Sequence, residues 1–347
     1  MAKPKEKAPA ANGRRGRGGV RDIRITDVAA LAQVSPITVS RALNNPEVVA
    51  PDTLRRIQQT VQQLGYVPNR LAGSLSSSKS RLIAAIVPTV AHSLFSTSIQ
   101  AFSDTMSRAG YQVLLGLSGY SEEDELHVLD AAVSRRPEGV LLVGVARTAP
   151  LRARLLSLQL PTVETWDDTD LPVDMLVGFS HYDVGVALAQ HFLERGRRRP
   201  AIVSANDARA RARHDGFVQT MARHGIATLA DVSVAPPSSV ALGREKLAQM
   251  LDARADIDCV ICGSDLLALG VLGEARERGL SVPGKLAVCG FGDLDFAAEL
   301  RPALTSVRVD GKRIGTAAAD CLIARLRGAP AQDKVDVGFE IVVRDTA

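Results

Sequence analysis

The chain has 347 residues, a formal net charge of +4 at pH 7 and a hydrophobic content of 46%. This length allows two or three domains with substantial cores. No apolar run reaches the roughly 18 residues that a membrane-spanning helix needs. The basic, Gly- and Ala-rich start lacks the apolar segment of a secretory signal, and four cysteines are too few for a disulfide framework. We therefore expect a protein of the reducing cytoplasm that does not enter a membrane.

Positive charge is concentrated at the start of the chain. Residues 1–81 contain 14 Lys and Arg against 5 Asp and Glu, whereas the remaining residues contain 28 against 33. A basic head on a mildly acidic body is typical of a protein whose head binds a polyanion. Residues 1–22 show no periodicity and are predicted to be a disordered basic arm, although a solubilising tail would have the same charge.

Residues 23–68 have a helical pattern that short turns interrupt. Thr26 can cap a first helix, and Ser35 can cap a second one with Pro36 at its first position, where a missing N–H costs nothing. A third helix over residues 52–64 has an apolar stripe at helical spacing and would close a three-helix core. This arrangement predicts an all-helical helix-turn-helix domain that binds DNA.

The second helix of such a motif enters the major groove, and its first residues contact base edges. Arg41 could form two hydrogen bonds with a guanine, and Ile37 could contact a thymine methyl. Pro36 is the third candidate for base contacts. The other residues predicted to bind DNA, with hydroxyls suited to phosphate contacts, are Thr26, Ser35, Thr38 and Ser40. The alternative is that these hydroxyls are only surface polar groups.

After residue 81, short apolar runs alternate with amphipathic helical segments. Alternation of this kind predicts an α/β fold in which helices cover both faces of parallel sheets. About 260 residues are long for one such sheet, so two lobes are expected. The predicted strands are 82–87, 113–117, 140–145, 161–166, 175–179, 201–204, 232–235, 259–262 and 286–290. The predicted helices include 96–109, 122–135, 182–195, 215–224, 241–251 and 266–278.

Residues 25–44 resemble the N-terminal signature of the LacI/GalR (lactose-repressor-like) transcriptional regulators. The resemblance continues through residues 49–70 and, far downstream, through residues 287–293 and 302–306. It covers the chain from about residue 24 to the end and leaves out the basic arm. Within the family, the head motif and residues 175–180 look most like the gluconate-utilisation repressors.

The resemblance implies a two-lobed body like that of periplasmic sugar-binding proteins, in which the chain crosses between the lobes three times. It places the N-lobe near 81–179 and 308–330, and the C-lobe near 180–307 and 331–347. A small-molecule effector would bind in the cleft between the lobes, beyond the carboxyl ends of the strands.

Residues 69–80 would form a hinge helix and linker. Asn69 can cap this helix, which begins at Arg70 and is too short to be stable alone in water. The resemblance implies that it folds only on operator DNA, where paired hinge helices insert a leucine into the minor groove. Leu75 matches that leucine, and Ala72 matches the small residue beside it. Such a wedge unstacks and kinks the duplex.

The resemblance also implies residues for the effector site. Arg213 matches an arginine that binds the effector, and Asp265 matches an acidic residue that accepts effector hydroxyls. Phe95 and Trp166 match positions that line the cleft, with Ser93 nearby. The structural alternatives are a surface helix charge for Arg213, a helix N-cap for Asp265 and a core position for Trp166.

Arg209 lies four residues before Arg213 and would share a helix face with it. Two arginines on one face favour an anionic effector, so gluconate, a keto-derivative or its phosphate heads the candidates. A neutral sugar is the alternative.

The sequence gives little support for an enzyme, and we expect no catalytic residues, cofactor or metal. It contains no phosphate-binding Gly-rich motif after the first strand and no Gly-x-Ser-x-Gly elbow. Cys259 and Cys262 have metal-like spacing, but in a strand they point to opposite faces, so core positions are expected. A soluble sugar-binding protein would share the body but would need an export signal and no helix-turn-helix.

These features predict a homodimeric repressor that acts in the cytoplasm, on the nucleoid, by binding a palindromic double-stranded operator. A small sugar or sugar acid would release it. The metabolite could instead act as a corepressor. Dimer and tetramer both stay open, although no heptad repeat follows the body to form a tetramerising zipper.

Overall fold

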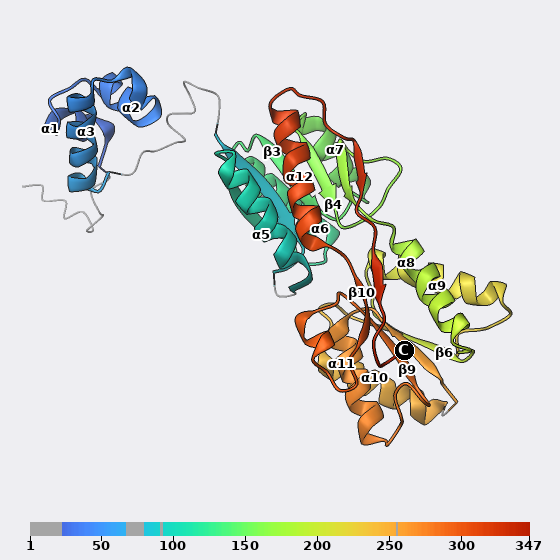
Figure 1. The fold of residues 1–347 in the computed structure, drawn as a ribbon. Helices are drawn as coiled ribbons and strands as arrows, with labels where there is room; N and C mark the ends of the chain where they lie inside the picture. Colours follow the sequence, from blue (N-terminus) through green and yellow to red (C-terminus); the bar gives the residue numbers. More distant parts are fainter. Residues whose placement is uncertain (1–22, 67–79, 91–92, 255) are drawn as a thin grey trace, which may run out of the picture. The chain divides into compact units, whose positions relative to one another are not determined.

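The computed structural model describes residues 23–66, 80–90, 93–254 and 256–347. The chain forms two units, Met1–Ser78 and Lys79–Ala347 (Figure 1). The predicted basic arm and the predicted hinge residues lie outside the described residues; the latter are Asn69, Arg70, Ala72 and Leu75.

The first unit is the predicted helix-turn-helix domain. Its helices pack around a small core in which Val28, Val39 and Ile57 are completely buried. The bounds are α1 (Ile25–Leu31), α2 (Pro36–Asn44), the 3₁₀ helix η1 (Pro46–Val48) and α3 (Pro51–Leu64). The third helix ends at Gly65, whose φ of +64° is the left-handed conformation that glycine adopts without strain.

The two predicted helix caps in this unit have different outcomes. Ser35 caps α2, because the backbone N–H of Thr38 donates to its Oγ at 3.2 Å, and Pro36 is the first helical residue. Thr26 is not a cap. It lies inside α1 and is exposed, and the helix begins after Arg24, whose N–H donates to the carboxylate of Asp27 at 2.8 Å. Asp27 therefore supplies the polar group that was expected from Thr26.

The second unit contains two six-stranded sheets, one in each lobe. The N-lobe sheet is parallel throughout, with the strand order β11-β5-β4-β3-β1-β2. Its strands are β1 (Leu82–Val87), β2 (Gln112–Leu117), β3 (Gly139–Val143), β4 (Thr162–Thr165), β5 (Met175–Gly178) and β11 (Lys334–Asp336). The C-lobe sheet has the order β12-β10-β9-β8-β6-β7 and is parallel except for β12. Its strands are β6 (Pro200–Ala205), β7 (Ala230–Val234), β8 (Cys259–Cys262), β9 (Ala287–Phe291), β10 (Thr305–Arg308) and β12 (Glu340–Val342).

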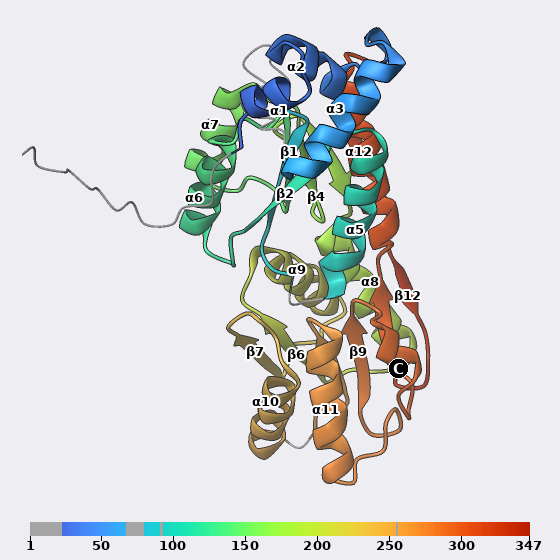
Figure 2. The same cartoon turned by 90° about the vertical axis from the view of Figure 1, so that its left-hand side faces the viewer.

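Helices cover both faces of each sheet, as the alternating pattern predicts. Side chains that alternate along β1 pack against α5 and α12 on one face and against α6 and α7 on the other. Figures 1 and 2 show α5 beside α12 in the N-lobe. The N-lobe helices are α5 (Ser93–Arg108), α6 (Glu122–Val133), α7 (Ala149–Leu158) and α12 (Gly311–Leu326). The C-lobe helices are α8 (His181–Glu194), α9 (Ala208–Arg223), α10 (Val240–Ala253), α11 (Asp265–Glu277) and the 3₁₀ helix η2 (Asp295–Ala298).

The chain crosses between the lobes three times, as expected. The crossings join β5 to α8, β10 to α12 and β11 to β12. The last crossing falls after Asp336 and not near residue 331, because β11 pairs with β5 of the N-lobe. The predicted boundary of the C-lobe at residue 331 is therefore too early.

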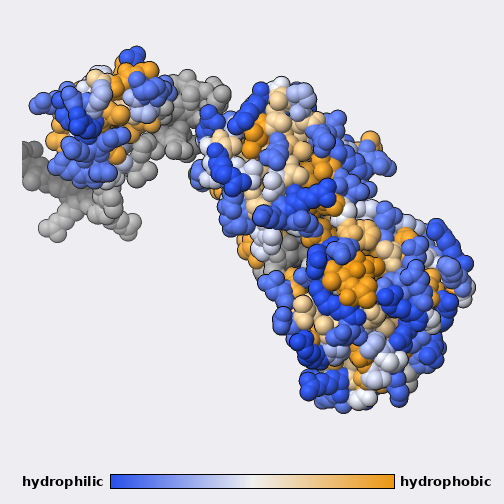
Figure 3. Space-filling model, viewed as in Figure 1, coloured by the Kyte–Doolittle hydropathy of each residue, from blue (hydrophilic) through white to orange (hydrophobic). Residues whose placement is uncertain are grey.

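Apolar side chains are enclosed between the layers, and hydrophilic residues dominate the face drawn in Figure 3, with separate hydrophobic patches. Cys259 and Cys262 are buried, unpaired and packed into two different core clusters, as expected for opposite faces of one strand. No group of metal-ligating side chains occurs among the described residues. In the same part of the chain, no helix is long and apolar enough to cross a membrane.

Candidate functional site

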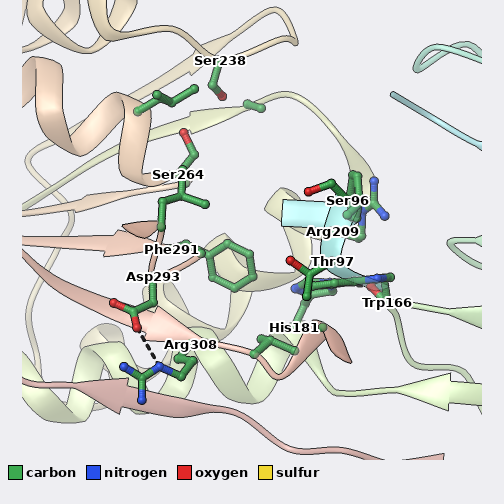
Figure 4. Close-up of a pocket in the computed structure, with 18 of the residues that line it drawn as sticks. Ser96, Thr97, Trp166, His181, Arg209, Ser238, Ser264, Phe291, Asp293 and Arg308 are labelled. Carbon is green, nitrogen blue, oxygen red and sulfur yellow. Dashed lines mark hydrogen bonds and ion pairs between the residues drawn. The ribbon is translucent and has the colours of Figure 1, made fainter. Parts of the chain in front are cut away.

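A cavity of about 800 Å³ lies between the two lobes of the body. The N-lobe contributes Phe95 and Trp166 to its wall, and the C-lobe contributes Arg209, Arg213 and residues 292–296. Figure 4 shows Trp166 and Arg209 among the residues that line the cavity. The carboxyl ends of parallel strands and the N-termini of helices from both lobes meet here, which is where α/β folds bind small molecules.

Arg213 is held in the wall of this cavity by three contacts. It lies on α9 and is 8% exposed. One guanidinium nitrogen, Nη1, donates to Nδ1 of His181 at 2.9 Å, and Nη2 donates to the carbonyl of Gly263 at 3.4 Å. The guanidinium carbon lies 4.1 Å from the ring centre of Phe291. Burial lowers the pKa of Arg213 to about 10, so the group stays charged at neutral pH.

Arg209 lies one turn earlier on the same helix and lines the same cavity. Its guanidinium carbon is 5.0 Å from the ring centre of Phe95, which belongs to the N-lobe. Its Nη1 is buried and has no hydrogen-bond partner. Neither Arg209 nor Arg213 forms an ion pair with any residue in the described part of the chain. A buried donor without a partner costs free energy, which a ligand acceptor would recover.

Three carboxylates around the cavity form hydrogen bonds or ion pairs with other groups of the protein. Asp207 accepts from the backbone N–H of Ala210 and caps α9. Asp310 caps α12 in the same way. Asp293 forms ion pairs with Arg308 and Arg344, each at 2.6 Å. Among the described residues, Arg209 and Arg213 therefore form no direct ion pair with these carboxylates, although the charge of Asp207 favours the charged form of Arg213. Two guanidinium groups on one wall suit an anionic ligand group.

Trp166 lines the cavity but exposes only 2% of its surface. Its indole N–H donates to Oγ of Ser98 at 2.8 Å, and Phe95 and Phe179 pack edge-on against it at 5.3 and 6.2 Å. Its φ of +61° is rare for a large side chain. The ring is thus largely a core group with one edge at the cleft, and Phe95 is buried beside it. Ser93 begins α5, and its side chain is outside the described residues.

Asp265 is not among the residues that line the cavity in this structure, and its contact with effector hydroxyls stays a prediction. The side chain is completely buried. It accepts from the hydroxyl of Ser306 at 2.6 Å and from the backbone N–H of Leu294 at 2.7 Å. Gly290 leaves room for it, because a Cβ there would lie 2.2 Å from the carboxylate. Ser264 caps α11 one residue earlier and lines the cavity instead.

His181, Asp293 and Arg308 line the cavity but were not predicted to do so from the sequence. Each of them lies at or just after the carboxyl end of a strand. His181 follows β5, Asp293 follows β9, and Arg308 is the last residue of β10. Their position at carboxyl ends of strands is a signal that could have found them. The strand β10 was not among the predicted strands, so Arg308 could not be placed.

The second candidate site is the helix α2 of the first unit. Val39 and Ala42 on one side of the helix are buried in the core, whereas Ile37 is 65% exposed and Arg41 is exposed as well. The side chains of Ser35 and Thr38 are joined by a hydrogen bond of 2.9 Å at the N-terminus of the helix. Ile37 and Arg41, two of the three predicted base readers, are therefore exposed on this helix.

A helix-turn-helix unit joined to a two-lobed body with a cleft defines a ligand-responsive DNA-binding regulator. Comparisons with known proteins agree with this class. Residues 24–69 match the family described as bacterial regulatory proteins, lacI family, and residues 189–347 match the periplasmic binding protein-like domain.

A relative named HTH-type transcriptional regulator GntR, from Pseudomonas aeruginosa, is 36% identical over 93% of this chain and 95% of its own length. A crystal structure of a LacI-family regulator from Silicibacter pomeroyi is 31% identical, with a TM-score of 0.89 over 93% of this chain and 99% of that chain. The lac repressor dimer bound to operator is 23% identical, with a TM-score of 0.82 over 94% and 99% of the two chains, and shows the shared fold. The chain belongs to the lacI family of bacterial regulatory proteins. It is a DNA-binding transcriptional regulator with an effector-binding domain, and its relatives are regulators, not enzymes.

Proposed function

We propose that this regulator is a homodimeric repressor of sugar-acid catabolism, which binds a palindromic operator and is released by a gluconate-type effector. The observation that supports the effector class is the pair Arg209 and Arg213, which line the same cavity and form no direct ion pair among the described residues. A carboxylate or phosphate group of the effector would meet both guanidinium groups.

The rest of the cavity fits a polyhydroxylated ligand. Hydroxyl and carboxylate groups of Ser96, Thr97, Ser264 and Asp293 surround it (Figure 4). Such groups orient sugar hydroxyls by hydrogen bonds. Gluconate heads the candidates because the head motif and residues 175–180 resemble the gluconate-utilisation repressors. A neutral sugar would leave the arginine pair unmatched and is the second candidate.

Two surface features support operator binding by a dimer. The exposed Ile37 and Arg41 of α2 suit base contacts, and a two-fold dimer would present two such helices to a palindrome. On the body, β2 is an edge strand of the N-lobe sheet, and it exposes Leu115 at 45% and Leu117 at 52%. Large apolar side chains on an open edge favour a partner surface. The lac repressor of the same fold is a dimer on its operator.

A gel shift on the DNA upstream of the protein's own gene tests the proposal. Purified protein is titrated with and without gluconate, gluconate 6-phosphate, ribose and galactose. We expect one acid to weaken the complex and the neutral sugars to have no effect. A neutral sugar that acts while every acid is inert would overturn the effector assignment, and a metabolite that strengthens the complex would make it a corepressor.

A further inference from the structure

His181 lies where the two lobes and the arginine pair meet. It is the first residue of α8, directly after the chain crosses from β5 of the N-lobe into the C-lobe. The ring is 3% exposed and lines the cavity (Figure 4). Phe179 packs against it at 4.5 Å and Phe291 at 5.9 Å, both measured between ring centres. Packing on both sides fixes the orientation of the imidazole.

The hydrogen bonds of His181 define its tautomer. Its Nε2 is 3.0 Å from the backbone carbonyl oxygen of Trp166, and a carbonyl oxygen can only accept. Nε2 therefore has the proton, and Nδ1 has the lone pair that accepts from Nη1 of Arg213 at 2.9 Å. A protonated ring would turn an N–H toward the guanidinium. Burial, and after it the charges of Arg213 and Arg209, hold the pKa of His181 well below its ordinary value of 6.5.

We propose that His181 is a positioning residue for the effector, which aims the guanidinium of Arg213 into the cleft and links it to the N-lobe wall at Trp166. The imidazole accepts from one guanidinium nitrogen while Gly263 accepts from the other, and Phe291 covers one face. The guanidinium can then present its remaining N–H groups in only one direction. This inference rests on the proposed anionic effector for its binding readout.

The two bonds of His181 can be separated by substitution. An Asn amide reaches the position of Nδ1, so His181→Asn keeps an acceptor for Arg213 and loses the donor to Trp166. A Gln amide reaches the position of Nε2, so His181→Gln keeps the donor to Trp166 and loses the acceptor. We expect His181→Gln to bind gluconate or gluconate 6-phosphate about ten- to hundredfold more weakly, the range for a hydrogen bond to a charged group. His181→Asn should stay within a few fold of the unaltered protein.

A double-mutant cycle shows whether the effect passes through Arg213. Calorimetric titrations with the same two acids compare His181→Gln alone, Arg213→Lys alone and the double variant. If His181 acts by orienting Arg213, the second substitution adds little to the first. Equal losses in both backgrounds, or the same loss in His181→Asn and His181→Gln, would mean that His181 only supports the fold and would overturn the proposal.

The role of His181 can also be tested without ligand, so that its failure can be distinguished from a failure of the proposed effector class. The six histidines are labelled with ¹⁵N, and the imidazole signals of His181 are assigned by their loss in His181→Gln. We expect a neutral ring with the proton on Nε2 at pH 7, because burial lowers the pKa of His181 well below its ordinary value. A ring that is protonated at pH 7, or that has its proton on Nδ1, contradicts the proposal whatever the effector is. If the ring is as expected and no acid binds, the effector class alone is wrong.

Discussion

At the scale of single residues, the carboxylates and the arginines that line the cavity differ in the partners that they have. The carboxylates of Asp207, Asp293 and Asp310 are engaged by helix N-termini or arginines. Arg209 and Arg213 lie against aromatic rings, an imidazole and a carbonyl and form no direct ion pair within the described residues. A buried charge without a counter-ion is unfavourable, because burial removes it from water. An anionic ligand would therefore gain more here than a neutral one.

The first prediction concerns Arg213. Its replacement by Gln should weaken binding of the acid effector by about 2–5 kcal/mol, since one partner of a buried charge pair is lost. Operator binding should be unchanged, which would give constant repression in cells. Calorimetry measures the first effect and a gel shift the second, and Trp166 fluorescence reports on the cleft.

Arg211 provides the matched control for that measurement. It lies on α9 between the other two arginines, but it is exposed, bonds to Asn206 at 3.0 Å and does not line the cavity. Arg211→Gln should bind the acid normally. If both variants lose binding equally, the effect is one of overall charge, and the site is not where we place it.

Asp265 acts on the cavity through the loop that it holds. Its carboxylate fixes Leu294 and Ser306, and Ser306 in turn accepts from the backbone N–H of Asp293 at 3.0 Å. Burial raises the pKa of Asp265 to about 6, against its ordinary value of 3.8. The folded protein then keeps a proton there that the unfolded chain has released between about pH 4 and pH 6.

The second prediction follows from the sign of this shift. Because the pKa is raised on folding, Asp265 favours the folded state at low pH, and that contribution is lost as the pH rises through about 6. It amounts to about 3 kcal/mol at most. Asp265→Asn cannot titrate, so the free energy of unfolding of the unaltered protein, relative to this variant, should fall between pH 5 and pH 7. Urea unfolding at the two values measures it, and a constant difference would show that Asp265 is ionised throughout.

At the scale of helices and strands, the hydrophobic pattern predicted the elements whose side chains are buried in a core. It missed elements that face the cleft or that form by pairing with a remote strand. The run 82–87 corresponds to β1, and the core stripe of α3 was recognised. Helix α9 was expected to start at Asp215 but starts at Ala208. Its first turns contain three arginines, because two of them face a cleft and not a core. The cap at Asp207 was the available signal.

Other elements depend on pairing or on positions remote in the sequence. Strand β11 is only three residues long, and two of them, Lys334 and Asp336, are charged and exposed; pairing with β5 makes it a strand. Asp265 and Trp166 show the same limit for the site. The family resemblance placed both near the cleft, but the hydrogen bonds to Ser306 and Ser98 determine where their polar atoms point.

The third prediction concerns the recognition helix α2. Its core side is buried through Val39 and Ala42, so Arg41 can be shortened without opening the core. Arg41→Ala should relax the preference for one base in each half-site at a cost of about 1–3 kcal/mol. A binding assay on operators substituted at single positions measures this. Equal losses on operator and random DNA would show that Arg41 contacts only phosphate.

At the scale of the whole molecule, three crossings join the two lobes of the body, and a cavity lies between them. Two of the crossings lie beside cavity residues: His181 follows the first, and Arg308 and Asp310 flank the second. A ligand that contacts both walls will favour one arrangement of the lobes, by an amount equal to its difference in affinity for the two arrangements. In a dimer, that arrangement would determine whether the DNA-binding units can pair on an operator.

The fourth prediction tests the dimer itself. Leu117 on the edge strand β2 is 52% exposed, and Leu117→Arg would place a charge in the proposed apolar contact. Analytical ultracentrifugation should then show more monomer, and operator affinity should fall. Effector binding should persist, because the cleft lies within one chain. Leu171→Arg, at an equally apolar but separate position that is 72% exposed, should leave the dimer intact.

The last prediction is that the effector lowers the affinity for operator by the same factor by which the operator lowers the affinity for the effector. If the acid lowers operator affinity tenfold, a coupling of about 1.4 kcal/mol, then saturating operator must lower the affinity for the acid tenfold as well, since the two binding events form a closed cycle. Calorimetric titration of the acid into free protein and into the protein–operator complex measures one side, and gel shifts at zero and saturating acid measure the other. Arg213→Gln should bring both factors to one without changing the affinity for operator in the absence of acid. Unequal factors would mean that a further state, such as dissociation of the dimer, takes part, and the mechanism would then include subunit exchange as well as movement of the lobes.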